Sequence, residues 1–149
     1  MDVKMAIVGS RNTGSVDFNH VMDELRNRME NPIIEVISGG AKGYDTMAAL
    51  WATLRGIAVT ELRPDYKKHG RAATFIRNRA IVDRADVVVA FWDGKSRGTK
   101  YTLDYAGKKN KATITIYTEA NGNKVDLFCT DRGKPRTVGR KVRNLDYRH

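Results

Sequence analysis

The stretch that decides the fold is Val87-Val88-Val89-Ala90-Phe91-Trp92-Asp93-Gly94-Lys95-Ser96-Arg97-Gly98-Thr99. It begins as a short apolar run, which is typical of a strand buried on both faces. A polar loop bounded by glycines follows, and a helical pattern starts at Gly98-Thr99. The first N–H groups of a helix lack acceptors within the helix, and the helix dipole is positive at that end. This strand-to-helix turn therefore favours an anion.

The rest of the chain repeats the strand–loop–helix pattern. Apolar runs predict strands at residues 3–9, 33–37, 57–62, 86–92 and 112–117. Helical spacing predicts helices from a cap at Ser15 to Met29, and at 44–54, 72–84 and 99–109, with residues 64–71 as a polar connection. Alternating strands and helices indicate right-handed βαβ units. The predicted fold is α/β: Rossmann-like and doubly wound, with a mainly parallel five-stranded sheet and helices on both faces.

Composition limits the class of protein. The 149 residues predict one main domain with a substantial core, and 41% hydrophobic content is ordinary for a globular chain. No apolar run is long enough to span a bilayer, and the first residues lack a signal-peptide pattern. Cys129 has no partner cysteine, so nothing calls for an oxidising compartment. We expect a cytoplasmic protein without membrane partners.

The net charge of +10 is the unusual bulk property. Residues 131–149 carry seven Lys/Arg against two Asp, which is half of the net charge. The turn signal Asn121-Gly122-Asn123 predicts a hairpin or an added edge strand before this basic tail. We divide the chain into a domain at 1–117 and an extension at 118–149. The charge of this tail predicts attraction to polyanions. The alternative is a solvated tail that only aids solubility.

Glycine loops follow the first, second and fourth strands, and the carboxyl ends of parallel strands meet at one sheet edge. Glycines let backbone N–H groups approach an anion closely, and nearby Ser, Lys and Arg side chains add donors. Asp45 suits either a helix N-terminal acid or a ribose hydroxyl. The predicted ligand-binding residues are Gly9, Ser10, Arg11, Ser38, Gly39, Gly40, Lys42, Gly43, Asp45, Asn78, Gly94, Ser96, Arg97, Gly98 and Thr99.

Other patterns are less informative. The histidines lack ligand spacing, so we predict no metal site and no cofactor. The stripe Met47, Leu50, Trp51 and Leu54 is expected to be core. Asn78 lies in a helix interior that it does not favour, which suggests a hydrogen-bonding role.

Four motifs together resemble the YspA/YAcAr-type branch of the SLOG superfamily, which includes the LONELY GUY phosphoribohydrolases and the DNA-processing protein DprA. The motifs are Gly9-Ser10-Arg11, the loop from Ser38 to Asp45, Ile76-Arg77-Asn78-Arg79 and the stretch from Phe91 to Thr99. The resemblance covers residues 3–117. It implies a Rossmann-like domain that binds a nucleotide or nucleotide-derived ligand and often dimerises, for which exposed Tyr66 and Trp92 are candidate contacts.

The resemblance also assigns roles. Arg77 takes the place of the arginine near the ligand phosphate and the scissile bond. The family's catalytic Glu, three residues after Gly-Thr, is replaced by Thr102. Asp104 lies roughly 200° around the helix from that position, so Asp93 is the carboxylate best placed to compensate. The candidate catalytic residues are therefore Arg77 and Asp93, and whether the protein is an enzyme stays open.

Three functions follow in order of preference. The first is a nucleotide-binding sensor or sequestering module. The second is a nucleotide N-glycosidase or phosphoribohydrolase. The third is a single-stranded DNA-binding protein of the DprA type, which uses the basic tail.

Overall fold

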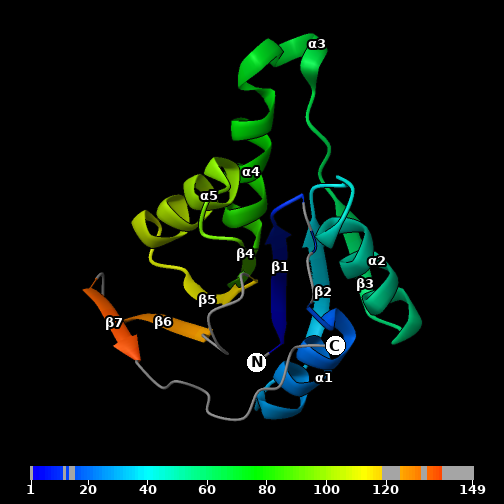
Figure 1. The fold of residues 1–149 in the computed structure, drawn as a ribbon, viewed down its shortest axis with the longest axis vertical. Helices are drawn as coiled ribbons and strands as arrows, with labels where there is room; N and C mark the ends of the chain where they lie inside the picture. The colour runs from blue at the N-terminus through cyan, green and yellow to red at the C-terminus, as the bar shows by residue number, and fades with distance from the viewer. Residues whose placement is uncertain (1, 12, 14–15, 119–124, 132–133, 139–149) are drawn as a thin grey trace.

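The computed structural model describes residues 2–11, 13, 16–118, 125–131 and 134–138. Their strands form a single sheet of order β3-β2-β1-β4-β5-β6-β7 (Figure 1). The strands are β1 (Val3–Gly9), β2 (Ile33–Ser38), β3 (Ala58–Glu61), β4 (Val87–Trp92), β5 (Ala112–Tyr117), β6 (Val125–Asp131) and β7 (Lys134–Val138). The first five strands are parallel, whereas β6 and β7 continue the sheet antiparallel. The predicted α/β class and Rossmann-like parallel sheet are confirmed.

The order of the strands creates one switch point, between β1 and β4. From β1 the chain builds outward through β2 to β3, then returns to place β4 on the other side of β1. The register pairs Gly9 with Phe91, so the two strands end side by side. In open α/β sheets, ligands bind in the crevice at such a point.

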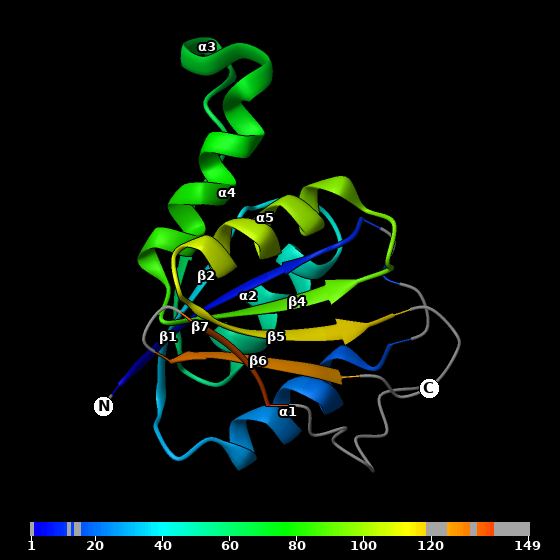
Figure 2. The ribbon, with the colours of Figure 1, turned by 90° about the vertical axis from the view of Figure 1, so that its left-hand side faces the viewer.

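Helices cover both faces of the sheet, as Figure 2 shows. They are α1 (Phe18–Arg28), α2 (Tyr44–Leu54), α3 (Tyr66–His69), the 3-10 turn η1 (Gly70–Ala72), α4 (Ala73–Arg84) and α5 (Arg97–Lys108). Alternate strand residues point to opposite sides. Met5 and Ile7 of β1 pack in the cluster formed with α1 and α2, whereas Ala6 and Val8 pack in the cluster formed with α4 and α5. No helix within the described ranges is both long and apolar enough to cross a bilayer.

Most predicted elements agree with the structure to within one or two residues, but four details differ. The first helix begins at Phe18, with Asp17 as its N-cap accepting from the backbone N–H of His20, whereas the predicted cap Ser15 lies outside the described residues. The polar connection contains α3 and η1, because Asp65 caps a turn there. Leu50 and Leu54 are 60% and 71% exposed, since they point away from the face of α2 on which Trp51 is buried. The strand β7 was not predicted.

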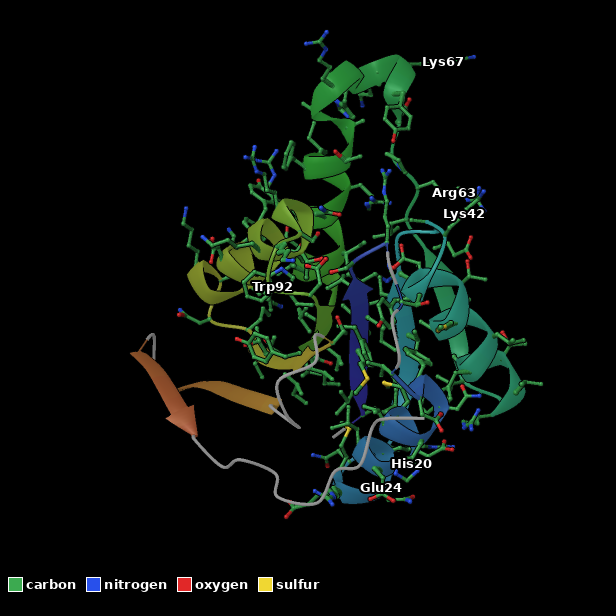
Figure 3. All side chains as sticks on the ribbon, in the orientation of Figure 1. His20, Glu24, Lys42, Arg63, Lys67 and Trp92 are labelled. Carbon is green, nitrogen blue, oxygen red and sulfur yellow. The ribbon has the colours of Figure 1, made fainter. Side chains whose placement is uncertain are left out.

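The segment from α3 to the first turns of α4 projects beyond the sheet (Figures 1 and 2). None of the residues of α3 is buried. Figure 3 places Lys67 at the tip of this projection and Arg63 beside Lys42 below it. The projection therefore rises from the same sheet edge as the glycine loops.

Candidate ligand-binding site

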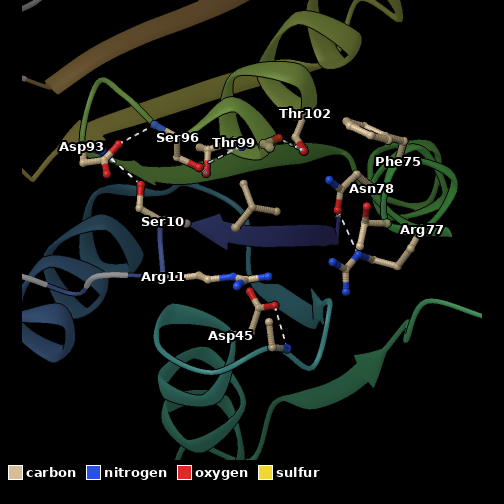
Figure 4. A pocket seen from close by; sticks show the side chains of 15 residues that line it. Ser10, Arg11, Asp45, Phe75, Arg77, Asn78, Asp93, Ser96, Thr99 and Thr102 are labelled. Atoms are coloured by element: carbon tan, nitrogen blue, oxygen red, sulfur yellow. Dashed lines mark hydrogen bonds between the residues drawn. The ribbon is translucent and has the colours of Figure 1, made fainter. Parts of the chain in front are cut away.

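A cavity of about 580 Å³ opens at the switch point (Figure 4). Its walls come from the segments after β1, β2 and β4, together with α4 and the start of α5. The lining residues are Val8, Gly9, Ser10, Arg11, Ala41, Asp45, Thr74, Phe75, Arg77, Asn78, Asp93, Ser96, Gly98, Thr99 and Thr102. Ten predicted site residues are thereby brought together: Gly9, Ser10, Arg11, Asp45, Arg77, Asn78, Asp93, Ser96, Gly98 and Thr99.

The end of β1 passes tightly over the ring of Tyr44. A Cβ at Gly9 would lie 2.5 Å from Cδ2 of that ring, so only glycine fits. The Tyr44 hydroxyl donates a 2.6 Å hydrogen bond to the carbonyl oxygen of Thr13, and burial raises the pKa of Tyr44 to about 12. The hydroxyl therefore stays a donor and holds the loop that carries Arg11. The Arg11 side chain points into the cavity (Figure 4).

The loop after β4 is held by Asp93. Its Oδ1 accepts hydrogen bonds from the backbone N–H groups of Lys95 (2.8 Å) and Ser96 (2.7 Å). The backbone N–H of Asp93 donates to Oγ of Ser10, which joins this loop to the end of β1. Burial alone would raise the pKa of Asp93, but the N–H donors of Ser96 and Lys95 outweigh it and hold that pKa below its usual range.

The loop leads into the N-terminus of α5, which faces the cavity. Ser96 is the N-cap, and its Oγ accepts from the backbone N–H of Thr99. The hydroxyl of Thr102 lines the cavity but donates to the carbonyl oxygen of Gly98 at 2.9 Å. Thr102 thus occupies the position expected for a catalytic Glu, with its hydroxyl engaged within the helix. Asp104 is exposed on another side of α5 and pairs with Lys100.

The glycine loop after β2 contributes Asp45. Its Oδ2 accepts from the backbone N–H of Ala41 at 3.0 Å. Burial raises the pKa of Asp45, and the hydrogen bond from Ala41 and the charge of Arg77 only partly oppose this. The cavity therefore holds two carboxyl groups, Asp45 and Asp93, whose pKa values are shifted in opposite directions.

Arg77 reaches the same loop from α4. Its Nη1 donates a 2.6 Å hydrogen bond to the carbonyl oxygen of Gly39, and its Nε donates to Oδ1 of Asn78 at 2.9 Å. Asn78 has the hydrogen-bonding role that its helix position suggested. The guanidinium is fixed at the cavity wall by these two bonds.

Seven predicted site residues lie outside this cavity wall. Ser38 is fully buried, and its Oγ has no hydrogen-bond partner within the described residues. Gly39 and Gly40 line a neighbouring cavity instead, Gly43 is the N-cap of α2, and Gly94 lies in an exposed turn. Lys42 and Arg97 are exposed.

Five other residues line the cavity. Of these, Thr102 was singled out in the sequence as the position where the family's Glu is replaced, and four were not predicted: Val8, Ala41, Thr74 and Phe75. Val8 and Ala41 are next to predicted site residues in the sequence, so extending the prediction to the neighbours of each glycine would have included them. Thr74 and Phe75 follow the predicted polar connection, and only the projection of α4 brings them to the cavity. Trp92, a candidate contact between subunits, is half-buried and donates its indole N–H to the carbonyl oxygen of Ser96. Within the described ranges no cluster of His, Cys, Asp or Glu could hold a metal ion.

Comparison with known proteins gives a family match over part of the chain and a fold. Residues 3–69 match the model of the family described as "YspA, cpYpsA-related SLOG family", so the resemblance is confirmed over that part of the chain. No curated protein matches the chain.

Two solved structures share the fold. DNA processing protein A of Helicobacter pylori, described for its single-stranded DNA-binding mode, aligns with TM-score 0.60 and 21% identity over 82% of this chain and 68% of that one. DprA of Streptococcus pneumoniae aligns with TM-score 0.59 and 21% identity over 81% of this chain and 52% of that one. At this level of identity the two structures support the fold alone.

Proposed function

Because residues 3–69 carry the sequence pattern of the YspA, cpYpsA-related SLOG family, we propose that this protein binds a nucleotide or nucleotide-derived small molecule at the carboxyl edge of its sheet. It acts as a sensor or a sequestering module in the cytoplasm. One observation carries the proposal: Arg11, Arg77 and the N-terminus of α5 face a single cavity at the switch point.

The phosphate belongs between these groups. The start of α5 offers the backbone N–H of Gly98 and the partial positive charge of a helix N-terminus, whereas the N–H of Thr99 is taken by the N-cap Ser96. Arg11 adds a guanidinium that makes no ion pair within the described residues. Phe75 supplies an exposed aromatic face at the cavity, and base–aromatic stacking accepts any base.

Isothermal titration calorimetry with a panel of nucleoside mono-, di- and cyclic phosphates tests the proposal. Arg11→Ala should weaken binding about 10- to 100-fold, because a hydrogen bond to a charged group contributes about 1.5–3 kcal/mol. Lys95→Ala is the matched control: it also removes one positive charge near the site, but Lys95 does not line the cavity. The absence of binding by every nucleotide at millimolar concentration would contradict the proposal.

An N-glycosidase or phosphoribohydrolase is the second candidate. It is favoured by the two carboxyl groups of opposite pKa shift, which is how acid and base roles are commonly separated. In this alternative Asp45 is the proton donor, Asp93 supports positive charge at the sugar, and Arg77 binds the phosphate. Release of free base from nucleoside monophosphates should be lost in both Asp93→Asn and Asp45→Asn. Base release that is unchanged in both variants rules out this assignment.

Binding of single-stranded DNA is the third candidate. It is favoured by the net charge of +10. Neutralising about six phosphates would give a log–log salt slope near −4 for a single strand. A flat salt dependence in a fluorescence-anisotropy titration would exclude it. We further propose a homo-oligomer, which light scattering coupled to size-exclusion chromatography would identify.

A further inference from the structure

A second cavity of about 310 Å³ adjoins the first. The two cavities share four wall residues, Arg11, Ala41, Thr74 and Arg77. Beyond this shared wall, the second cavity is lined by Gly39, Gly40, Arg63, Pro64 and Tyr66. It therefore lies between the glycine loop after β2 and the projecting segment that carries α3.

Each cavity has one exposed aromatic side chain. Phe75 lines the first and is 43% exposed, and its ring is fixed against Tyr101 in an edge contact with centroids 4.8 Å apart. Tyr66 lines the second and is 61% exposed. Large aromatic faces left in contact with solvent at two neighbouring cavities are suited to stacking on two separate rings.

The two arginines of the shared wall, Arg11 and Arg77, line both cavities. Two positive charges at one boundary match a linker that carries two negative charges. Arg63 adds a third cation on the side of Tyr66. Its side chain packs on Gly40, where a Cβ would lie 3.3 Å from the Arg63 Nε, and it pairs with Glu61 at 3.2 Å.

The first cavity is already as large as common small-molecule sites, which span about 300–1,000 Å³. A mononucleotide held there, with its phosphate at the shared wall, would leave the second cavity and Tyr66 without an occupant. A ligand with a second ring-bearing half occupies both.

Resting on the proposed function, we propose that the ligand is a dinucleotide of the dinucleoside-diphosphate class. Its diphosphate lies at Arg11 and Arg77, one base stacks on Phe75, and the other half enters the second cavity against Tyr66. Tyr66 and Arg63 then determine specificity for two-part ligands over mononucleotides.

Calorimetry with diadenosine diphosphate and AMP tests this inference, because AMP is half of that dinucleotide. The full chain should bind the dinucleotide at least ten times more tightly than AMP. Tyr66→Ala should weaken dinucleotide binding about 5- to 100-fold, the range expected for one stacked base, and leave AMP binding unchanged. Lys67→Ala is the control, since Lys67 adjoins Tyr66 on α3 but lines neither cavity.

Equal affinities for AMP and the dinucleotide would overturn the two-part site while leaving the proposed function intact. An equal effect of Tyr66→Ala and Lys67→Ala would also overturn it. Failure of both probes to bind at millimolar concentration would overturn the inference, and the proposed function would fall with it only if every nucleotide of the wider panel also failed to bind. A single-stranded oligonucleotide that binds through Tyr66, with no advantage of the dinucleotide over AMP, would assign the second cavity to a nucleic-acid path instead.

Discussion

Nη1 of Arg77 lies 2.6 Å from the carbonyl oxygen of Gly39 and donates a hydrogen bond to it. This bond joins α4 to the glycine loop across a separation of 38 residues. A Cβ on Gly39 would lie 2.5 Å from Nη1 of Arg77 and 3.0 Å from Oδ2 of Asp45. The glycine thus permits Arg77 and Asp45 to meet at one point of the backbone.

We therefore expect Gly39→Ala to displace the Arg77 guanidinium from the cavity wall. Because the methyl group meets the flexible end of the Arg77 side chain, the fold should lose only about 1 kcal/mol, the contribution of the bond from Arg77 to Gly39. Nucleotide binding should weaken at least tenfold. Urea unfolding and calorimetry would measure the two effects. Gly107→Ala in α5 is the control, because a Cβ there meets nothing within 4 Å. It should stabilise the helix by up to about 1 kcal/mol and leave binding unchanged. Normal affinity in Gly39→Ala would show that the position of Arg77 does not matter.

Tyr44→Phe tests whether the loop after β1 must be held in place. The substitution keeps the stacked contact with Phe91, whose ring centroid lies 4.8 Å away, but removes the hydroxyl that binds the Thr13 carbonyl. The free energy of unfolding should fall by about 1 kcal/mol, and nucleotide binding should weaken several-fold because Arg11 is less well positioned. Thermal unfolding and calorimetry measure both quantities. Nucleotide binding equal to that of the unsubstituted protein would mean that the hydrogen bond from the Tyr44 hydroxyl to Thr13 is not needed to position Arg11.

The two carboxyl groups of the cavity should give opposite pH dependences of stability. The pKa of Asp45 is raised by burial, so its favourable contribution is present below the ordinary Asp pKa and is lost as pH rises through the folded value. The stability of Asp45→Asn relative to the unsubstituted protein should therefore improve between about pH 4 and pH 7.

The pKa of Asp93 is lowered, so its stabilising contribution is present above the ordinary Asp pKa and is lost as pH falls through the folded value. Asp93→Asn should therefore be destabilising at pH 7, and this deficit should shrink below about pH 4. Urea unfolding of both variants across pH 3–7 would measure the trends. Parallel trends in the two variants would contradict the inference that burial raises the pKa of Asp45 and that backbone N–H donors lower the pKa of Asp93.

Removal of residues 139–149 tests the basic tail and keeps the whole of β7 (Lys134–Val138) in the chain. These residues carry four Lys/Arg and one Asp, a net charge of +3. If they contact single-stranded DNA, the slope of log K against log salt should become less steep by about 2, and affinity should fall most at low salt. Fluorescence anisotropy at several salt concentrations would measure the slope. Nucleotide binding in the cavity should be unaffected, which separates the two activities.

Most of the fold could be predicted because local patterns decide it. The short, β-branched apolar runs at β1, β4 and β5 favour strands. The glycines after β1, β2 and β4 allow the turns that gather at the switch point. The pattern fails where burial is decided by neighbours. Leu50 fits the helical spacing of core residues, yet in the structure it faces solvent.

The sequence by itself determined the parallel sheet, the edge at which its loops meet and most of the residue types gathered there. Only the tertiary structure decided how each side chain is used. Asp45 is buried, and the loop held by Asp93 is joined to Ser10 at the end of β1, because both features depend on contacts between distant segments. The bond from Thr102 to Gly98 is local to α5, but the packing of α5 at the switch point is what brings Thr102 to the cavity wall. The sequence of the turn from β4 to α5 favours binding of an anion, but the packing of α4 and α3 shapes the cavities beside this turn.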